Sequence, residues 1–293
     1  MVVVGAPRIA PSTAEQVLEF AAEYAPDVAA GVIDFEGLRR FRGPGLEELN
    51  SEPRSRPALA YAGASVPADP FSDLNQWLLK VLLAPEIPDE YLSAPRQQYR
   101  NASELAKTAG VSVASGYRFV QQLQADGYVD DSKGYLQLVR RGSLFGQWKA
   151  AASRRVKDVP VRLLVGGDPH AAAASIARGR SACLGLFAAA DAIDAGFVEG
   201  VPPYVYVRRL GREAIRDRSN LVPAERYEAP DLFLRKAPAP ESIFRGMVER
   251  DGVSVSDVIQ IWLDASVHPT RGQEQADLIR RRILQDVIPA ESD

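Results

Sequence analysis

Apolar positions in the first fifty residues predict a small βαβ unit. Residues 2–4 and 31–35 are short apolar runs typical of strands, and apolar side chains recur at helical spacing over residues 17–22. Ser12 or Thr13 is the expected N-cap of that helix. We assign this unit to residues 1–57. It is too short to close a larger sheet before the Pro-rich stretch that ends it, so we expect it to lean on the segment that follows.

Residues 71–142 carry the pattern of a winged helix-turn-helix. An apolar helix is expected over 71–83, a short helix over 103–109 that Gly110 ends, and a second helix over 112–124. Two alternating strands then flank a polar turn at 130–134. Helix, turn, helix and hairpin in this order are typical of that DNA-binding motif. Gly116 stands inside the second helix, where we expect it to permit close packing against the first.

The remaining residues, 143–293, predict an α/β domain with helices on a small sheet. The helices are expected over 143–156, 170–178 with Asp168 as cap, 181–197, 254–267 and 272–287, and the strands over 161–165, 204–207 and 231–236. The fold class of the whole chain is therefore α/β, of the α+β kind, in three domains.

Charge sets the middle of the chain apart from its flanks. The net charge of the 293 residues is −3, but it is −7 over residues 1–94, +6 over 95–160 and −2 over 161–293. Neutralisation of phosphates is local, so a basic segment inside an acidic protein is typical of a surface that meets a polyanion. A basic domain without such a partner is the alternative.

Composition excludes several kinds of site. One cysteine (Cys183) and two histidines (His170 and His268) do not supply a disulfide framework or a Cys/His zinc site. We expect no metal and no cofactor. No apolar run approaches the ~20 residues that cross a bilayer, so we expect a cytoplasmic protein without a membrane partner.

The expected partner is double-stranded DNA, bound by the outward face of the second helix in the major groove. Arginine and glutamine side chains on that face suit guanine and adenine edges, and small hydroxyl and lysine side chains suit phosphates. The expected contacts are Val113, Ala114, Tyr117, Arg118, Gln121 and Gln122 on the helix face, Ser103, Lys107, Ser112 and Ser115 at phosphates, Lys133 on the wing, and Arg140 and Arg141 after it. A protein-interaction module with a solvated polar face is the alternative.

A basic cluster after the wing bears on assembly. It comprises Arg140, Arg141, Lys149, Arg154, Arg155 and Lys157. One winged helix offers a thin footprint, and this cluster would extend it along the DNA backbone. We therefore favour a monomer that binds DNA cooperatively over a free homodimer that reads an inverted repeat.

Residues 111–129 resemble bacterial winged-helix regulators. Together with 203–207, 254–264 and 268–276, they are similar to AbiEi-type antitoxins of type IV toxin–antitoxin systems. The resemblance covers about residues 70–288. It implies a winged helix that binds promoter DNA and represses its own operon, an α/β antitoxin domain, and a nucleotidyltransferase-like toxin as genetic partner. The chain departs from the family by about 70 residues ahead of the winged helix, which puts toxin neutralisation in doubt more than DNA binding.

An enzyme is the alternative from another class, either a nuclease or a nucleotide-handling domain. Residues 2–41 faintly resemble part of a restriction-endonuclease-like domain, with carboxylates at Asp27, Asp34 and Glu36. A nuclease of that kind also needs a nearby lysine, and the first lysine of the chain is Lys80. We therefore expect no catalytic residues. The sequence predicts a DNA-binding transcriptional regulator.

Overall fold

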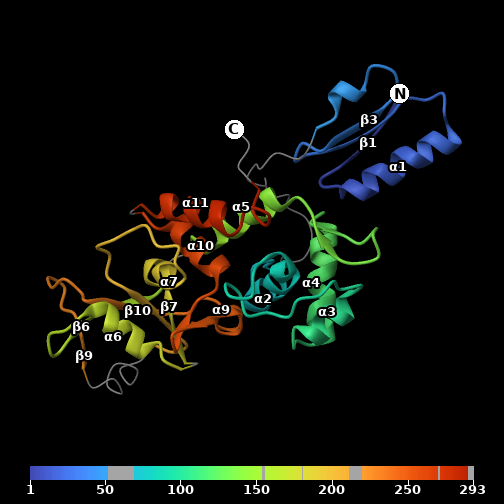
Figure 1. Cartoon of the computed structure of the whole chain (residues 1–293). Coiled ribbons are helices and arrows are strands. Elements are labelled where there is room, and N and C mark those ends of the chain that lie inside the picture. Colours follow the sequence, from blue (N-terminus) through green and yellow to red (C-terminus); the bar gives the residue numbers. More distant parts are fainter. Residues whose placement is uncertain (52–68, 154–155, 180, 211–219, 270, 290–293) are drawn as a thin grey trace. The chain divides into compact units, whose positions relative to one another are not determined.

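The structure is a computed structural model that describes residues 1–51, 69–153, 156–179, 181–210, 220–269 and 271–289. The chain forms two compact units. Unit 1 comprises residues 1–70, 97–148 and 287–293, and unit 2 comprises 71–96 and 149–286. Figure 1 traces how the chain passes from one unit to the other and back.

The N-terminal part of unit 1 is a three-stranded sheet with one helix. Strands β1 (Val2–Ala6) and β2 (Ala30–Asp34) are parallel, and helix α1 (Pro11–Tyr24) connects them, as the sequence predicts. Strand β3 (Arg39–Arg42), which the sequence did not reveal, pairs antiparallel with β2, and a short 3-10 helix, η1 (Glu47–Leu49), follows. Ala10 is the N-cap residue of α1, not Ser12 or Thr13.

The rest of unit 1 follows the expected order of two helices and a hairpin. Helix α3 (Ala102–Thr108) precedes helix α4 (Val113–Ala125). Strands β4 (Val129–Asp130) and β5 (Gln137–Leu138) pair antiparallel, and helix α5 (Arg141–Ala152) begins directly after them.

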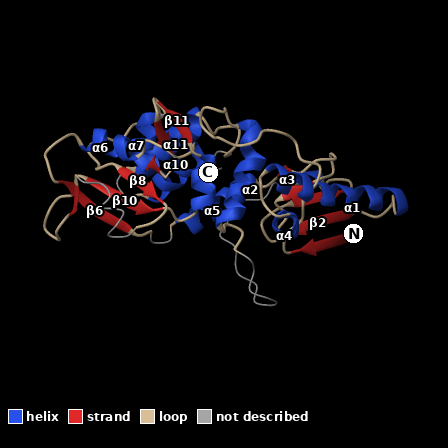
Figure 2. Cartoon of the chain, turned by 90° about the horizontal axis from the view of Figure 1, so that it is seen from below, coloured by secondary structure: helices blue, strands red, loops and turns tan. Residues whose placement is uncertain are grey.

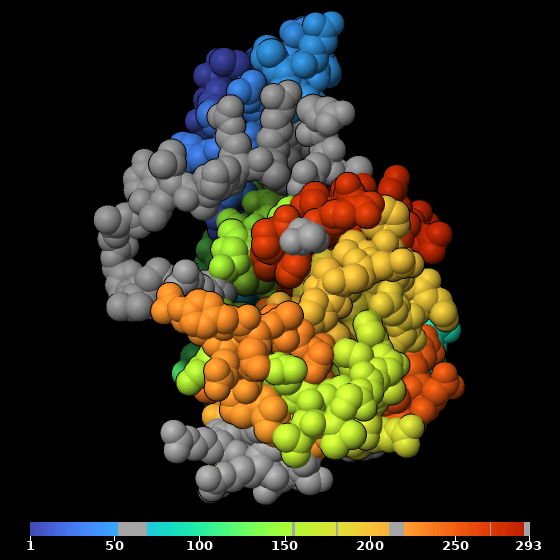
Figure 3. Space-filling model, turned by 90° about the vertical axis from the view of Figure 1, so that its left-hand side faces the viewer, coloured from blue at the N-terminus to red at the C-terminus, as the bar shows by residue number. Residues whose placement is uncertain are grey.

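Unit 2 is built on a seven-stranded mixed sheet, larger than the small sheet that we expected. Its order is β11-β12-β7-β8-β10-β6-β9. The strands are β6 (Asp158–Leu163), β7 (Ala182–Gly185), β8 (Tyr204–Val207), β9 (Leu221–Pro223), β10 (Leu232–Lys236), β11 (Val248–Arg250) and β12 (Val253–Val255). Figure 2 shows β6, β8 and β10 side by side. On the surface in Figure 3, the β6 and α6 region and the β9 and β10 region adjoin, although they lie far apart in sequence.

The helices of unit 2 carry its apolar core. They are α2 (Asp73–Leu83), the 3-10 helix η2 (Ala84–Glu86), α6 (Pro169–Ile176), α7 (Leu186–Ala192), α9 (Pro240–Gly246), α10 (Val258–Val267) and α11 (Gly272–Arg282). Eight consecutive residues of α10, from Val258 to Ala265, are buried. Asp168 caps α6 as expected, because its carboxylate accepts the backbone N–H groups of His170 and Ala171.

Helix α2 belongs to unit 2 and not to the expected domain 71–142. It packs against α9, and the Nζ atom of Lys80 lies 2.7 Å from the Oδ2 atom of Asp257, at the start of α10. Both side chains are fully buried. Of the elements expected for domain 71–142, α3, α4 and the β4–β5 hairpin lie in unit 1.

Two apolar runs that we expected to be single helices are each divided. Residues 181–197 form strand β7 and then the short helix α7, with Leu186 at a φ of 52° where they meet. Residues 254–267 begin in strand β12, and helix α10 starts only after its cap, Asp257. Within the described ranges, no helix is both long and apolar enough to span a membrane.

Candidate nucleic-acid interface

Helices α3 and α4 approach closely at Gly116. A Cβ atom on this residue would lie 2.6 Å from the Cβ atom of Ala106 and 2.9 Å from the carbonyl oxygen of Ala102. Real Cβ atoms do not approach neighbours so closely, so only glycine fits without a shift of α3. This confirms the expectation that Gly116 permits close packing of the two helices.

The turn between α3 and α4 is defined by a glycine, a backbone hydrogen bond and a serine cap. Gly110 has a φ of 65°, a left-handed conformation that glycine adopts at low cost, and the backbone N–H of Val111 donates to the carbonyl oxygen of Ala106 at 3.0 Å. The Ser112 hydroxyl then caps α4, because it accepts the backbone N–H of Ser115 at 3.1 Å.

One side of α4 is buried and the other is open. Gly116, Phe119, Val120 and Leu123 are buried, whereas Val113 and Tyr117 are 54% and 57% exposed. Ala114, Arg118 and Gln121 are exposed as well. The structure thus brings five of the six expected face residues together as an open surface, and we call these five residues the α4 face.

The sixth expected residue, Gln122, is engaged within unit 1. Its side-chain amide donates to Asp126 Oδ2 at 2.8 Å, and it is only half-exposed. The Nε atom of Arg118, by contrast, donates to the carbonyl oxygen of Ala114 in its own helix, at 3.3 Å. A bond of this length along the helix surface leaves the guanidinium accessible.

The expected phosphate contacts surround the α4 face. Ser103, Lys107, Ser112 and Lys133 are exposed, and Ser115 is half-exposed. The Ser112 and Ser115 hydroxyl oxygens lie 2.9 Å apart. These side chains present donors at the ends of α3 and α4 and on the hairpin, where the sequence placed them.

Arg140 is not available to a phosphate, contrary to expectation. Only 1% of its side chain is exposed, and its guanidinium forms ion pairs with Asp34, at 2.7 Å, and with Glu36. The reason is that two carboxylates from the N-terminal sheet lie directly against the base of the hairpin. Arg141 is half-buried, with its Nε donating to the carbonyl oxygen of Leu138.

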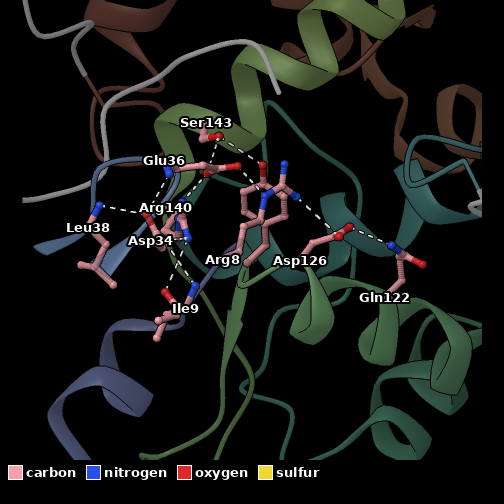
Figure 4. A network of polar contacts seen from close by, with 10 residues as sticks. Arg8, Ile9, Asp34, Glu36, Leu38, Gln122, Asp126, Arg140 and Ser143 are labelled. Carbon is pink, nitrogen blue, oxygen red and sulfur yellow. Dashed lines mark hydrogen bonds and ion pairs between the residues drawn. The ribbon is translucent and has the colours of Figure 1, made fainter. Parts of the chain in front are cut away.

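Figure 4 shows the polar network around Arg140. Asp34 accepts bonds from the backbone N–H groups of Ile9, Glu36 and Leu38, and Glu36 also pairs with Arg8. The Ser143 hydroxyl donates to Glu36 at 3.3 Å. The network fastens the N-terminal sheet to the hairpin and to α5, as expected for a unit that leans on its neighbour.

Two further contacts extend the network to α4 and its hairpin. The Arg8 guanidinium lies 3.5 Å from Asp126, just beyond α4, and 5.1 Å from the ring centre of Tyr128. The Ser12 hydroxyl donates to Asp130 in β4 at 2.8 Å. Burial raises the pKa of Tyr128, and burial raises the pKa of Tyr99 to about 12.

Two of the three carboxylates expected for a nuclease, Asp34 and Glu36, are paired with arginines. Asp34 also accepts a backbone N–H, and the Arg140 guanidinium lies between Asp34 and Glu36. In the part of the chain that the structure describes, no group of three or more His, Cys, Asp or Glu side chains is placed to hold a metal ion.

Asp264, His268 and Arg271 of unit 2 each contact neighbouring side chains. Tyr206 and Gln260 bond Asp264, and burial raises the pKa of this carboxyl. His268 lies edge-on to Phe187, and Arg271 stacks over the ring of Phe197.

The basic cluster after the wing is described only in part. Lys149 bonds Gln273 within unit 2 at 3.1 Å, and Arg154 and Arg155 lie outside the described residues. Arg140 is buried and does not contribute to the extended basic footprint that the sequence predicted.

Sequence reasoning missed the Arg8, Glu36 and Arg140 contacts. The partners of Arg140 precede it by more than 100 residues, so no local spacing reveals them. Comparison with known proteins gives no further guidance: no family model, no curated protein and no solved structure matches this chain.

Proposed function

We propose that the chain is a sequence-specific double-stranded DNA-binding regulator, with α3, α4 and the β4–β5 hairpin forming a winged helix-turn-helix. The observation that carries the proposal is the α4 face. It is an open helix surface bearing Arg118, Gln121 and Tyr117, held at its back by the Gly116 contact with α3. Such a rigid helix suits entry into a major groove.

Local charge supports a polyanionic partner. Lys107, Arg118 and Lys133 are exposed on α3, α4 and the hairpin turn. Asp34 and Glu36 are paired with Arg140 and Arg8. The acidic residues of the N-terminal sheet that lie nearest to the hairpin therefore do not oppose a phosphate backbone.

The proposal is tested by selecting a binding site from random duplexes and measuring affinity for it. Loss of a bidentate arginine contact to guanine costs about 1–3 kcal/mol at one base pair. We expect Arg118→Ala and Gln121→Ala each to weaken binding and to relax preference at a defined base pair. Lys107→Ala should weaken binding evenly across sequences and lower the salt dependence.

Gln124→Ala is the matched control. Gln124 is exposed on the same helix, but its amide donates to Asp131 at the hairpin turn, at the C-terminal end of α4. Its replacement should leave base preference unchanged. Equal affinity and preference in the Arg118→Ala, Gln121→Ala double variant and the unmodified protein would overturn the proposal, as would DNA binding that is absent or insensitive to salt.

The resemblance to AbiEi-type antitoxins extends the proposal to autorepression. We propose that the bound DNA is the promoter of the chain's own operon, with a nucleotidyltransferase-like toxin as the genetic partner. A reporter fused to that promoter should be repressed by the intact chain and released by the Arg118→Ala, Gln121→Ala double variant. Repression that survives the double variant would contradict this role of α4.

A further inference from the structure

The edge strand β1 is apolar and uncharged, and no described strand pairs with its outer edge. Val2, Val3 and Val4 are 59%, 41% and 44% exposed, whereas β2 beside them is almost wholly buried. Among the described residues β1 pairs with β2 alone, and α1 packs over β2 and β3. Soluble proteins normally protect such an edge with charge, proline or a covering element, because it invites another strand.

The backbone of β1 leaves defined donors and acceptors on this edge. The N–H of Val2 donates to the carbonyl oxygen of Ala29 at 2.8 Å, so Val2 turns its polar groups toward β2. Backbone groups of successive residues in a strand point to opposite sides. Val4 and Ala6 therefore also face β2, and Val3 and Gly5 direct their N–H and carbonyl groups to the open edge.

The apolar surface continues onto α1. Phe20 and Tyr24 are 64% and 67% exposed, and their ring centres lie 4.5 Å apart on one flank of the helix. At 100° per residue, Glu15 and Glu19 fall on the opposite flank. In a right-handed crossover, the rule for parallel strands joined by a helix, the aromatic flank lies on the β1 side and the acidic flank on the β3 side.

We propose that a second copy of this chain docks on this edge, so that the two β1 strands pair antiparallel across a two-fold axis. Val4 then lies opposite the partner's Val4, and Val3 exchanges hydrogen bonds with the partner's Gly5. The surface is self-complementary, as a two-fold interface requires, since every outward group of Val3 and Gly5 finds a mate. Two uncharged strands meet, and the acidic flanks of both α1 helices point away.

The resulting sheet is continuous through both subunits. The aromatic pairs of the two α1 helices flank the seam on the side of the sheet that carries Val2 and Val4. This assembly differs from the cooperative monomer that the sequence favoured. The dimer does not depend on DNA binding. If the chain binds DNA as proposed above, the dimer supplies two α4 helices for an inverted repeat.

A single cysteine tests the register. Opposite residues at a non-hydrogen-bonded antiparallel pair have Cα atoms about 4.5 Å apart, within the range of a disulfide. Mild oxidation of the full chain carrying Val4→Cys should yield a covalent dimer. Val2→Cys should not, because the two copies of residue 2 would lie about 14 Å apart. The native Cys183 is fully buried, so the unmodified chain serves as the control and should form no covalent dimer.

Sedimentation across a dilution series tests the surface itself. The unmodified protein should sediment as a dimer, and Val3→Pro and Val3→Lys as monomers. Proline at residue 3 removes only an outward N–H, so the hydrogen bonds between β1 and β2 are kept. The lysine variant tests the same surface in case the proline variant misfolds. Leu164→Lys replaces an apolar residue in unit 2 that is 65% exposed, and it should remain dimeric.

The outcomes separate this proposal from its rivals. A monomer at every concentration, together with no disulfide in Val4→Cys, would overturn it and would favour an edge that the chain itself protects. A dimer that persists in both Val3 variants would also overturn it, because the interface would then lie elsewhere. Neither result bears on the α4 face, whose test is base preference.

Discussion

At the scale of single residues, Gly116 shows how packing reverses a helix propensity. In an exposed helix, replacing glycine with alanine stabilises by about 1 kcal/mol. At Gly116 the new methyl group would meet α3 at 2.6 Å. We expect Gly116→Ala to lower the free energy of unfolding of unit 1 by about 1–2 kcal/mol, since overpacking costs about 1–3 kcal/mol.

Gly146 is the matched control for that substitution. It lies inside α5, is exposed and has no atom within 4 Å of the position of an added Cβ. Gly146→Ala should stabilise the protein by up to about 1 kcal/mol. Urea unfolding followed by circular dichroism measures both. If the two substitutions had the same sign, the close approach of α3 and α4 would be refuted.

Residue types and their spacing predicted the exposed α4 face but not the burial of Arg140. Exposure of Arg118 and Gln121 follows from helical periodicity, which is local information. Arg140 stands beside a second arginine and looks accessible in the sequence. In the structure its backbone has a φ of 54°, and its side chain is buried against two carboxylates from the N-terminal sheet. Contacts of that kind depend on the tertiary fold, and sequence spacing does not encode them.

At the scale of elements, the Lys80 and Asp257 pair fastens α2 to α10. Asp257 also accepts the backbone N–H groups of Ile259 and Gln260, both at 3.1 Å, so one carboxylate caps α10 and binds α2. Removing the cation would leave a buried charge without its partner. We expect Lys80→Ala to lower the free energy of unfolding of unit 2 by about 3–5 kcal/mol.

An exposed ion pair in the same unit provides the comparison. Arg162 and Glu228 are 43% and 38% exposed, and pairs of that kind contribute about 0–1 kcal/mol. Arg162→Ala should therefore change stability little. Denaturant titrations of both variants would show the contrast, and a loss for Lys80→Ala no larger than that for Arg162→Ala would be inconsistent with a structural role of the buried pair.

The elements that sequence reasoning located well were those with caps or turns. Ser112, Asp168 and the polar turn at 130–134 marked true boundaries. Sequence reasoning failed at β7 and α7, where a buried strand is followed directly by a buried helix. An apolar run has no amphipathic period, so hydrophobicity does not distinguish these two states.

At the scale of the whole molecule, buried tyrosines in both units link stability to alkaline pH. Burial raises the pKa of Tyr99 to about 12 from an ordinary value of 10.0, and it raises the pKa values of Tyr128 and Tyr206. The native state favours the neutral phenols. Their contribution is therefore complete below about pH 10 and is lost as the pH rises toward 12.

We therefore expect the free energy of unfolding to fall between about pH 10 and pH 12. Urea titrations at several pH values would measure this fall, with tyrosinate absorbance recorded in parallel. Tyr99→Phe should make the decline shallower, because one group with a raised pKa is removed. A decline as steep in that variant as in the unmodified protein would show that Tyr99 does not contribute.

The separation of Lys80 from Asp257 has a consequence for synthesis on the ribosome. The two residues lie 177 positions apart in the chain. At about 5–20 residues per second, α2 leaves the ribosome roughly 9–35 seconds before its partner exists. During that interval the apolar face of α2 and its lysine have no native site to occupy, while residues 97–148, which belong to unit 1, have already emerged. The helix that comes early in the chain is thus among the last to dock, and a nascent chain paused before residue 257 is the species that most needs a chaperone.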